Sequence, residues 1–113
     1  MKNTKSLVIS SDKIEGTTVY NTDGDKLGSI DDLMIDKTSG RIRFAVLEFG
    51  GFLGIGTDRY PMPWHLLAYD AAKEGYVVPI DQERLHEAPQ YGEGKTPPFT
   101  DEYNEMINAY YGD

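Results

Sequence analysis

The chain of 113 residues is one domain by size, because a domain of this length buries only about 65% of its unfolded surface and can form one modest core. Its net charge of -8 disfavours nucleic acid and anionic membrane surfaces as partners. Cysteine is absent, which excludes disulfides and thiolate chemistry. The apolar run Leu7-Val8-Ile9 near the N-terminus is far shorter than a membrane span, so we expect a cytoplasmic protein without membrane insertion.

The N-terminal part of the sequence predicts an arm followed by a first strand. Residues 1–9 are polar at the start and are expected to form a flexible arm. Residues 12–16 favour a turn or a single helical turn. The β-branched and aromatic residues at 17–20 favour a strand, and the Asn-Thr-Asp-Gly sequence at 21–24 favours a tight turn.

A second strand is predicted over residues 26–36, with an irregularity in the middle. Its apolar residues do not alternate strictly, because Ile30 and Leu33 are three positions apart whereas Leu33 and Ile35 are two apart. A β-bulge at residues 31–32 would bring all three side chains to one face and would bend the strand, as a small barrel requires.

The middle of the chain predicts a mainly β fold. Residues 41–49 alternate apolar and polar side chains and form the strongest predicted strand, whereas the prolines at 59–63 leave that segment extended at best. Residues 66–69 and 75–80 favour a closing hairpin. The expected fold is therefore a small antiparallel β-barrel of five to six short strands, carrying a C-terminal amphipathic helix.

The C-terminal part of the sequence predicts a linker and a helix outside the barrel domain, which we place at residues 10–86. Residues 87–99 are rich in proline, glycine and charge and are expected to form a linker. Residues 100–113 are expected to form a helical appendage with Thr100 as its N-cap. Its apolar stripe has the i, i+3, i+4, i+7 spacing and consists of Tyr103, Met106, Ile107 and Tyr110.

The order of several short motifs resembles the PRC-barrel domain family. These motifs are Val19-Tyr20, DGDKLGSI at 23–30, LMID at 33–36, Gly40, RFAVL at 43–47, GGFLGIG at 50–56 and PWHLL at 63–67. The resemblance spans about residues 10–85. The family covers the cytoplasmic part of the photosynthetic reaction-centre H subunit, the C-terminal domain of the ribosome-maturation factor RimM, and many stand-alone proteins, and this chain is most similar to the stand-alone class.

The resemblance implies a small β-barrel that makes protein–protein contacts and has no catalytic centre shared across the family. We therefore expect a non-enzymatic interaction module that self-associates as a homo-oligomer or docks on a larger assembly. A role as an accessory of photosynthetic electron transfer or ribosome maturation is a further alternative, which rests on the family analogy alone.

The segment at residues 21–32 has oxygen-bearing side chains at several positions of a calcium-binding loop. Lys26 stands where that loop needs glycine for its sharp turn, and Gly28 stands where a hydrophobic residue is normal. The predicted flanking elements are strands instead of helices. A hairpin turn is the favoured interpretation, and a barrel that binds calcium or a small ligand for regulation stays open as the alternative.

The sequence offers no catalytic or cofactor-binding constellation. The glycine-rich segment at 50–56 lacks the lysine and the following helix of a phosphate-binding loop. His65 and His86 have no spacing that suggests a shared metal. We expect no catalytic residue, no metal ligand and no cofactor.

The candidate interaction surface combines the glycine-rich segment, the apolar end of the strand before it and the C-terminal helix. Apolar side chains on a glycine-rich loop either fold back on the core or meet a partner. Tyrosine is enriched at protein interfaces. The candidate residues are Phe49, Phe52, Leu53, Ile55, Tyr60, Tyr103, Met106, Ile107 and Tyr110.

Overall fold

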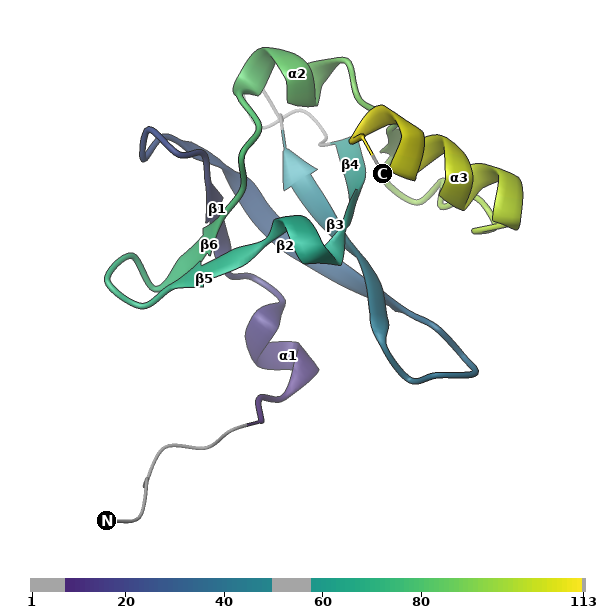
Figure 1. Ribbon diagram of the computed structural model, residues 1–113, viewed down its shortest axis with the longest axis horizontal. Coiled ribbons are helices and arrows are strands. Elements are labelled where there is room, and N and C mark those ends of the chain that lie inside the picture. The colour runs from purple at the N-terminus through teal and green to yellow at the C-terminus, as the bar shows by residue number, and fades with distance from the viewer. Residues whose placement is uncertain (1–7, 50–57, 113) are drawn as a thin grey trace.

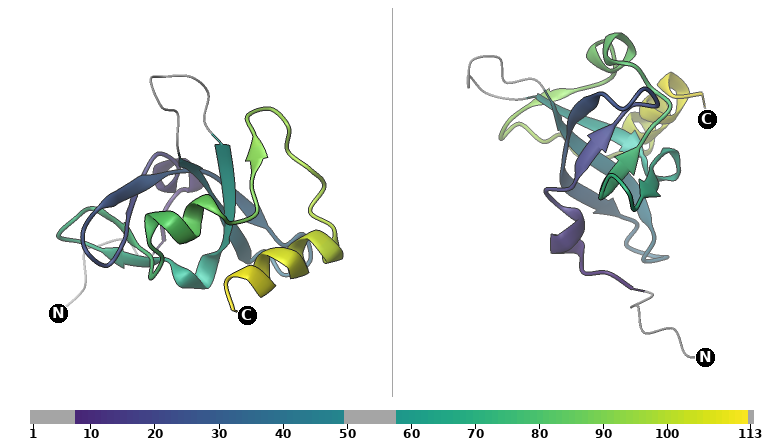
Figure 2. Two further views of the ribbon diagram at one scale, coloured as in Figure 1. Left: turned by 90° about the horizontal axis from the view of Figure 1, so that it is seen from above. Right: turned by 90° about the vertical axis from the view of Figure 1, so that its left-hand side faces the viewer.

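The computed structural model describes residues 8–49 and 58–112, which contain seven strands and short helices (Figures 1 and 2). The predicted residues Phe52, Leu53 and Ile55 lie outside the described residues. In chain order the elements are α1 (Ser11–Ile14), β1 (Thr18–Tyr20), β2 (Lys26–Ile35), β3 (Ile42–Phe49), β4 (Asp58–Pro63), the 3-10 helix η2 (Trp64–Leu66), β5 (Ala68–Asp70), β6 (Gly75–Val77), α2 (Gln82–His86), β7 (Tyr91–Gly92) and α3 (Asp101–Tyr110).

The strands form one mixed sheet in the order β5-β6-β1-β2-β3-β4-β7. The expectation of a mainly β fold is confirmed, but the described strands number seven instead of five to six, and β1 pairs with β6 in parallel. Closure into a barrel is not confirmed, because the hydrogen-bonded order runs from β5 at one edge to β7 at the other within the described part of the chain. The hairpin predicted near the end of the sheet is present as the antiparallel pair of β5 and β6.

The predicted bulge in β2 is present. The register between β2 and β3 shifts between Ile30 and Asp32, and it shifts again between Met34 and Ile35. Because of this second irregularity Ile35 does not share the buried face with Ile30: Ile30 is 1% exposed, whereas Ile35 is 54% exposed. The prediction that one bulge would bury both residues was wrong in this respect.

β4 is a full strand despite its two prolines. Its six residues pair with β3 from Asp58 to Pro63, so the expectation of an extended segment at best was too weak. Only Asp58 and Arg59 pair with β7 on the other side. Pro61 and Pro63 therefore lie where β4 is a sheet edge, which is the position in which strands tolerate proline.

The core draws on β3 and on both C-terminal helices. Phe44, Ala45, Val46 and Leu47 are all at most 2% exposed, so this part of β3 is covered on both faces. Leu85 of α2 and Ile107 of α3 are fully buried in the same cluster. α2 and α3 lie next to each other at the side of the sheet where β4 stands (Figure 1). The helix after Thr100 therefore contributes to the core of its own chain.

Gly28 marks a close approach between β2 and β3. A Cβ at this position would overlap the carbonyl oxygen of Glu48 and would lie 3.2 Å from its carbonyl carbon. These are backbone atoms and cannot rotate away, so only glycine lets the two strands pair at this distance. Gly92 in β7 differs, because a Cβ there would lie 3.6 Å from Cδ of the flexible Lys95 side chain, which is an ordinary contact distance.

We predict that Gly28→Ala lowers the free energy of unfolding by about 1–3 kcal/mol, because β2 and β3 must separate to admit the methyl group. Gly92→Ala is the matched control and should change it by less than about 0.5 kcal/mol. Urea unfolding followed by tyrosine and tryptophan fluorescence measures both. Equal midpoints for the two variants would contradict the close approach at Gly28.

Candidate interaction surface

The two C-terminal helices hold each other in place through one reciprocal contact. Arg84 of α2 donates a hydrogen bond from Nη2 to the backbone carbonyl of Tyr110 at 3.0 Å, and the Tyr110 hydroxyl donates one to the backbone carbonyl of Arg84. The guanidinium carbon of Arg84 lies 5.6 Å from the centre of the Tyr110 ring. This contact fixes the position of α3 relative to α2.

α3 begins as the sequence predicts. The Thr100 side chain accepts a hydrogen bond from the backbone N–H of Tyr103 at 3.2 Å, and Asp101 and Glu102 follow in the first turn, where the helix dipole favours negative charge. Ile107 and Tyr111 then face the core and are buried. Tyr103 and Tyr110 are half-buried against the same core, and Met106 lies on the exposed side of the helix.

A hollow of about 560 Å³, which we call the α3 groove, lies between α3 and the segment that follows α2. Its lining includes Ala88, Pro89 and Gln90 on one wall and Tyr103, Met106 and Tyr110 on the other. Met106 is 47% exposed, the only large hydrophobic residue of α3 that is so open. The Tyr103 hydroxyl is buried without a hydrogen bond, and burial raises the pKa of Tyr103.

The wall opposite α3 is held by Gln90. Its Nε2 donates hydrogen bonds to the backbone carbonyls of His86, at 2.9 Å, and Ala88, at 3.2 Å, while its Oε1 accepts one from the Tyr60 hydroxyl at 3.0 Å. The segment from α2 to β7 is therefore tied both to itself and to β4. This makes the α3 groove a fixed feature of the fold.

The structure separates the candidate residues into groups. Tyr103, Met106 and Tyr110 line the α3 groove. Ile107 is 0% exposed and Tyr60 is 3% exposed, so in this chain both belong to the core. Phe49 is half-buried, and its ring centre lies 5.5 Å from that of Tyr60 and 4.9 Å from that of His86.

Sequence reasoning missed the second wall of the groove and its anchor at β7. Residues 87–99 have no hydrophobic period, so the two-residue strand β7 within them gave no signal. An ion-pair cluster secures this segment: the buried Arg59 pairs with Asp31 of β2 at 3.1 Å and with Glu93 at 3.6 Å.

The oxygen-rich segment at 21–32 forms a turn at residues 21–25 and then the first part of β2. Asn21 is 7% exposed, and its Oδ1 accepts hydrogen bonds from the backbone N–H groups of Asp23, at 3.0 Å, and Asp25, at 2.9 Å. Asp31 is engaged with Arg59. Within residues 8–49 and 58–112, no group of three or more His, Asp or Glu side chains is arranged to hold a metal ion. No helix in these same ranges has the length and apolarity needed to cross a bilayer.

The model of the PRC-barrel domain family matches residues 8–85. The match runs from the residues before α1 through β6 and most of α2, and it leaves β7 and α3 outside. A comparison with curated proteins finds no match to this chain. The residues that line the α3 groove thus all lie beyond the family match.

Ile107 and Met106 are neighbours in α3 with opposite environments, which gives a matched pair of variants. We predict that Ile107→Ala lowers the free energy of unfolding by about 2–5 kcal/mol, because it opens a cavity in the core. Met106→Ala removes a half-exposed side chain and should cost less than about 1 kcal/mol. Denaturant unfolding of the purified variants tests this, and a similar cost for both would mean that α3 does not pack on its own chain.

Proposed function

Because the chain belongs to the PRC-barrel domain family, we propose that it is a non-enzymatic protein-interaction module whose first partner is a second copy of itself. The proposal rests on the α3 groove, in which Met106 is 47% exposed between two tyrosines. Tyrosine and methionine supply large contact areas and are enriched where proteins meet. The groove walls are fixed by the Arg84–Tyr110 and Gln90 contacts, so a partner meets a surface that is already formed.

The overall charge decides what kind of force must drive self-association. Two copies that each carry a net charge of -8 repel each other over the Debye length, which is about 10 Å at 0.1 M salt. Association of two such copies must therefore come from apolar contact. Added salt screens the repulsion, so it should strengthen a homodimer, whereas it would weaken a complex held by opposite charges.

We predict a dimer at tens of micromolar that becomes tighter between about 50 and 500 mM NaCl, because repulsion between the acidic copies is screened. Size-exclusion chromatography with light scattering measures the mass. Met106→Gln, which removes the apolar contact without changing the charge, should shift the equilibrium towards monomer by about tenfold in the dissociation constant.

Tyr69→Ser is the control for this experiment. Tyr69 is 60% exposed on the edge strand β5, outside the α3 groove, and its loss should leave the dimer intact. A monomer at both salt concentrations would refute self-association. A dimer that Met106→Gln leaves unchanged would place the interface elsewhere on the chain.

A further inference from the structure

A second hollow, which we call the hairpin cavity, lies between the turn from β2 to β3 and the start of α3. Its volume is about 580 Å³, and its lining includes Met34, Lys37, Arg43, Phe44, Phe99 and Asn104. Cavities of roughly 300–1000 Å³ hold small molecules in proteins. None of these residues lines the α3 groove, so an inference about this cavity is independent of the proposed interaction surface.

The floor of the hairpin cavity is aromatic. Phe44 of β3 is 2% exposed, and its ring centre lies 5.9 Å from that of Phe99, with the two ring planes inclined at 51°. The Phe99 ring is itself supported by Tyr103, with a centre-to-centre distance of 5.1 Å. A flat apolar ligand would find packed rings there instead of mobile side chains.

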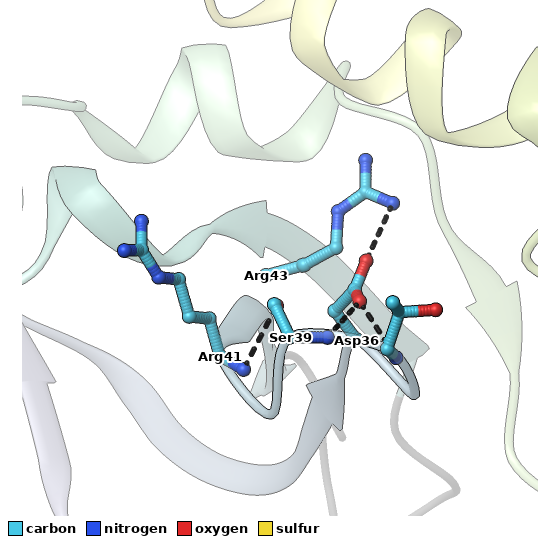
Figure 3. Close-up of polar contacts among 5 residues, drawn as sticks. Asp36, Ser39, Arg41 and Arg43 are labelled. Atoms are coloured by element: carbon cyan, nitrogen blue, oxygen red, sulfur yellow. Dashed lines mark hydrogen bonds and ion pairs between the residues drawn. The ribbon is translucent and has the colours of Figure 1, made fainter.

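The carboxylate of Asp36 makes its hydrogen bonds within the hairpin turn. Its Oδ1 accepts hydrogen bonds from the backbone N–H groups of Thr38, at 2.9 Å, and Ser39, at 2.8 Å. Arg43 Nη1 lies 3.7 Å from its Oδ2. Figure 3 shows the contacts of this carboxylate with Ser39 and Arg43. The hydrogen bonds from Ser39 and Thr38 hold the pKa of Asp36 below its ordinary value, so the group stays ionised at neutral pH. Asp36 therefore shapes the turn and positions Arg43.

Arg43 keeps donors available for a ligand. A guanidinium has five N–H donors, and the pair with Asp36 engages one nitrogen at the long distance of 3.7 Å. The group also lies over the Phe44 ring, 5.6 Å from its centre, beside the aromatic floor. With Lys37, the lining carries two cations against the single carboxylate of Asp36, so the cavity is locally positive in a chain of net charge -8.

Asn104 supplies a second, independent sign of a ligand. It is 7% exposed, it lines the hairpin cavity, and its Oδ1 is buried without a hydrogen bond. A buried carboxamide oxygen without a donor destabilises a fold, and a buried leucine of similar size would avoid the cost. A ligand that donates a hydrogen bond to this carboxamide explains why asparagine stands here.

We propose that the hairpin cavity binds a small aromatic carboxylate that also carries a hydroxyl or N–H donor. The carboxylate pairs with Arg43 and Lys37, the ring packs on Phe44 and Phe99, and the donor reaches Asn104. Each part of the ligand thus meets a group of matching chemistry in one hollow.

The test is an NMR titration of the full chain, labelled with ¹⁵N, using 4-hydroxyphenylacetate as the probe. The backbone amides of Thr38, Arg43 and Asn104 should shift together, with a dissociation constant on the order of millimolar, as for other ligands of this small size. The neutral analogue 4-hydroxyphenethyl alcohol has the same ring and chain but no carboxylate, and it should bind about tenfold more weakly. Phenylacetate lacks the phenol donor and should bind about threefold more weakly.

Three variants assign these preferences to residues. Arg43→Gln should reduce binding of 4-hydroxyphenylacetate to the level of the alcohol. Lys37→Gln, in the exposed turn, should also weaken this binding, and it replaces Arg43→Gln as the test if that substitution disturbs β3. Asn104→Leu should abolish the preference for the phenol over phenylacetate while phenylacetate still binds. Equal binding of the acid and the alcohol, shifts outside the cavity, or no shifts up to about 20 mM probe would overturn the proposal.

Discussion

The burial in the core of Ile107 of α3 and of Tyr111 at its C-cap is the contact on which the rest of the structure depends. It covers the side of the sheet where β4, with its two prolines, forms an edge. It also places α3 between two hollows: Tyr103, Met106 and Tyr110 form a wall of the α3 groove, and Asn104 closes the hairpin cavity. If α3 left this position, both hollows would lose a wall at once.

α3 holds this position through packing and caps, and it carries polar groups that weaken it. A helix of 10 residues is marginal by itself, so Ile107, the Thr100 cap and the Arg84–Tyr110 contact must hold it. Among the described residues, the buried side-chain polar atoms without a partner are the Tyr103 hydroxyl, the Asn104 Oδ1 and the Tyr111 hydroxyl. Burial also raises the pKa of Tyr111. All three belong to α3 or to its C-cap, and such local costs are expected where a protein binds something.

Local sequence patterns predicted much of the fold, but they did not predict the pairing of strands that are far apart in the chain. Alternation identified β3, the irregular spacing of Ile30 and Leu33 identified the β2 bulge, and the helical period identified α3 with its cap. The parallel pairing of β1 with β6 joins segments far apart in the chain, and the two residues of β7 are too few to show a period. The second irregularity, at Met34 and Ile35, exposed a residue that a single bulge would have buried.

The same division applies to the candidate surface. The helical period grouped Met106 with Ile107, but only the packing shows that one is half-exposed and the other lies in the core. The wall of the α3 groove formed by Ala88, Pro89 and Gln90 comes from a segment with the composition of a linker. The hairpin cavity is lined by side chains from β2, β3 and α3, and no spacing in the sequence predicts that these side chains lie together.

Native-state hydrogen exchange tests most directly whether α3 is part of the core. If it is, the amides of α3 around Ile107 exchange with an opening free energy within about 1 kcal/mol of that of the central β3 amides, because both open only when the whole domain unfolds. Exchange of the α3 amides at rates close to those of an unstructured peptide, while β3 remains protected, would contradict the account.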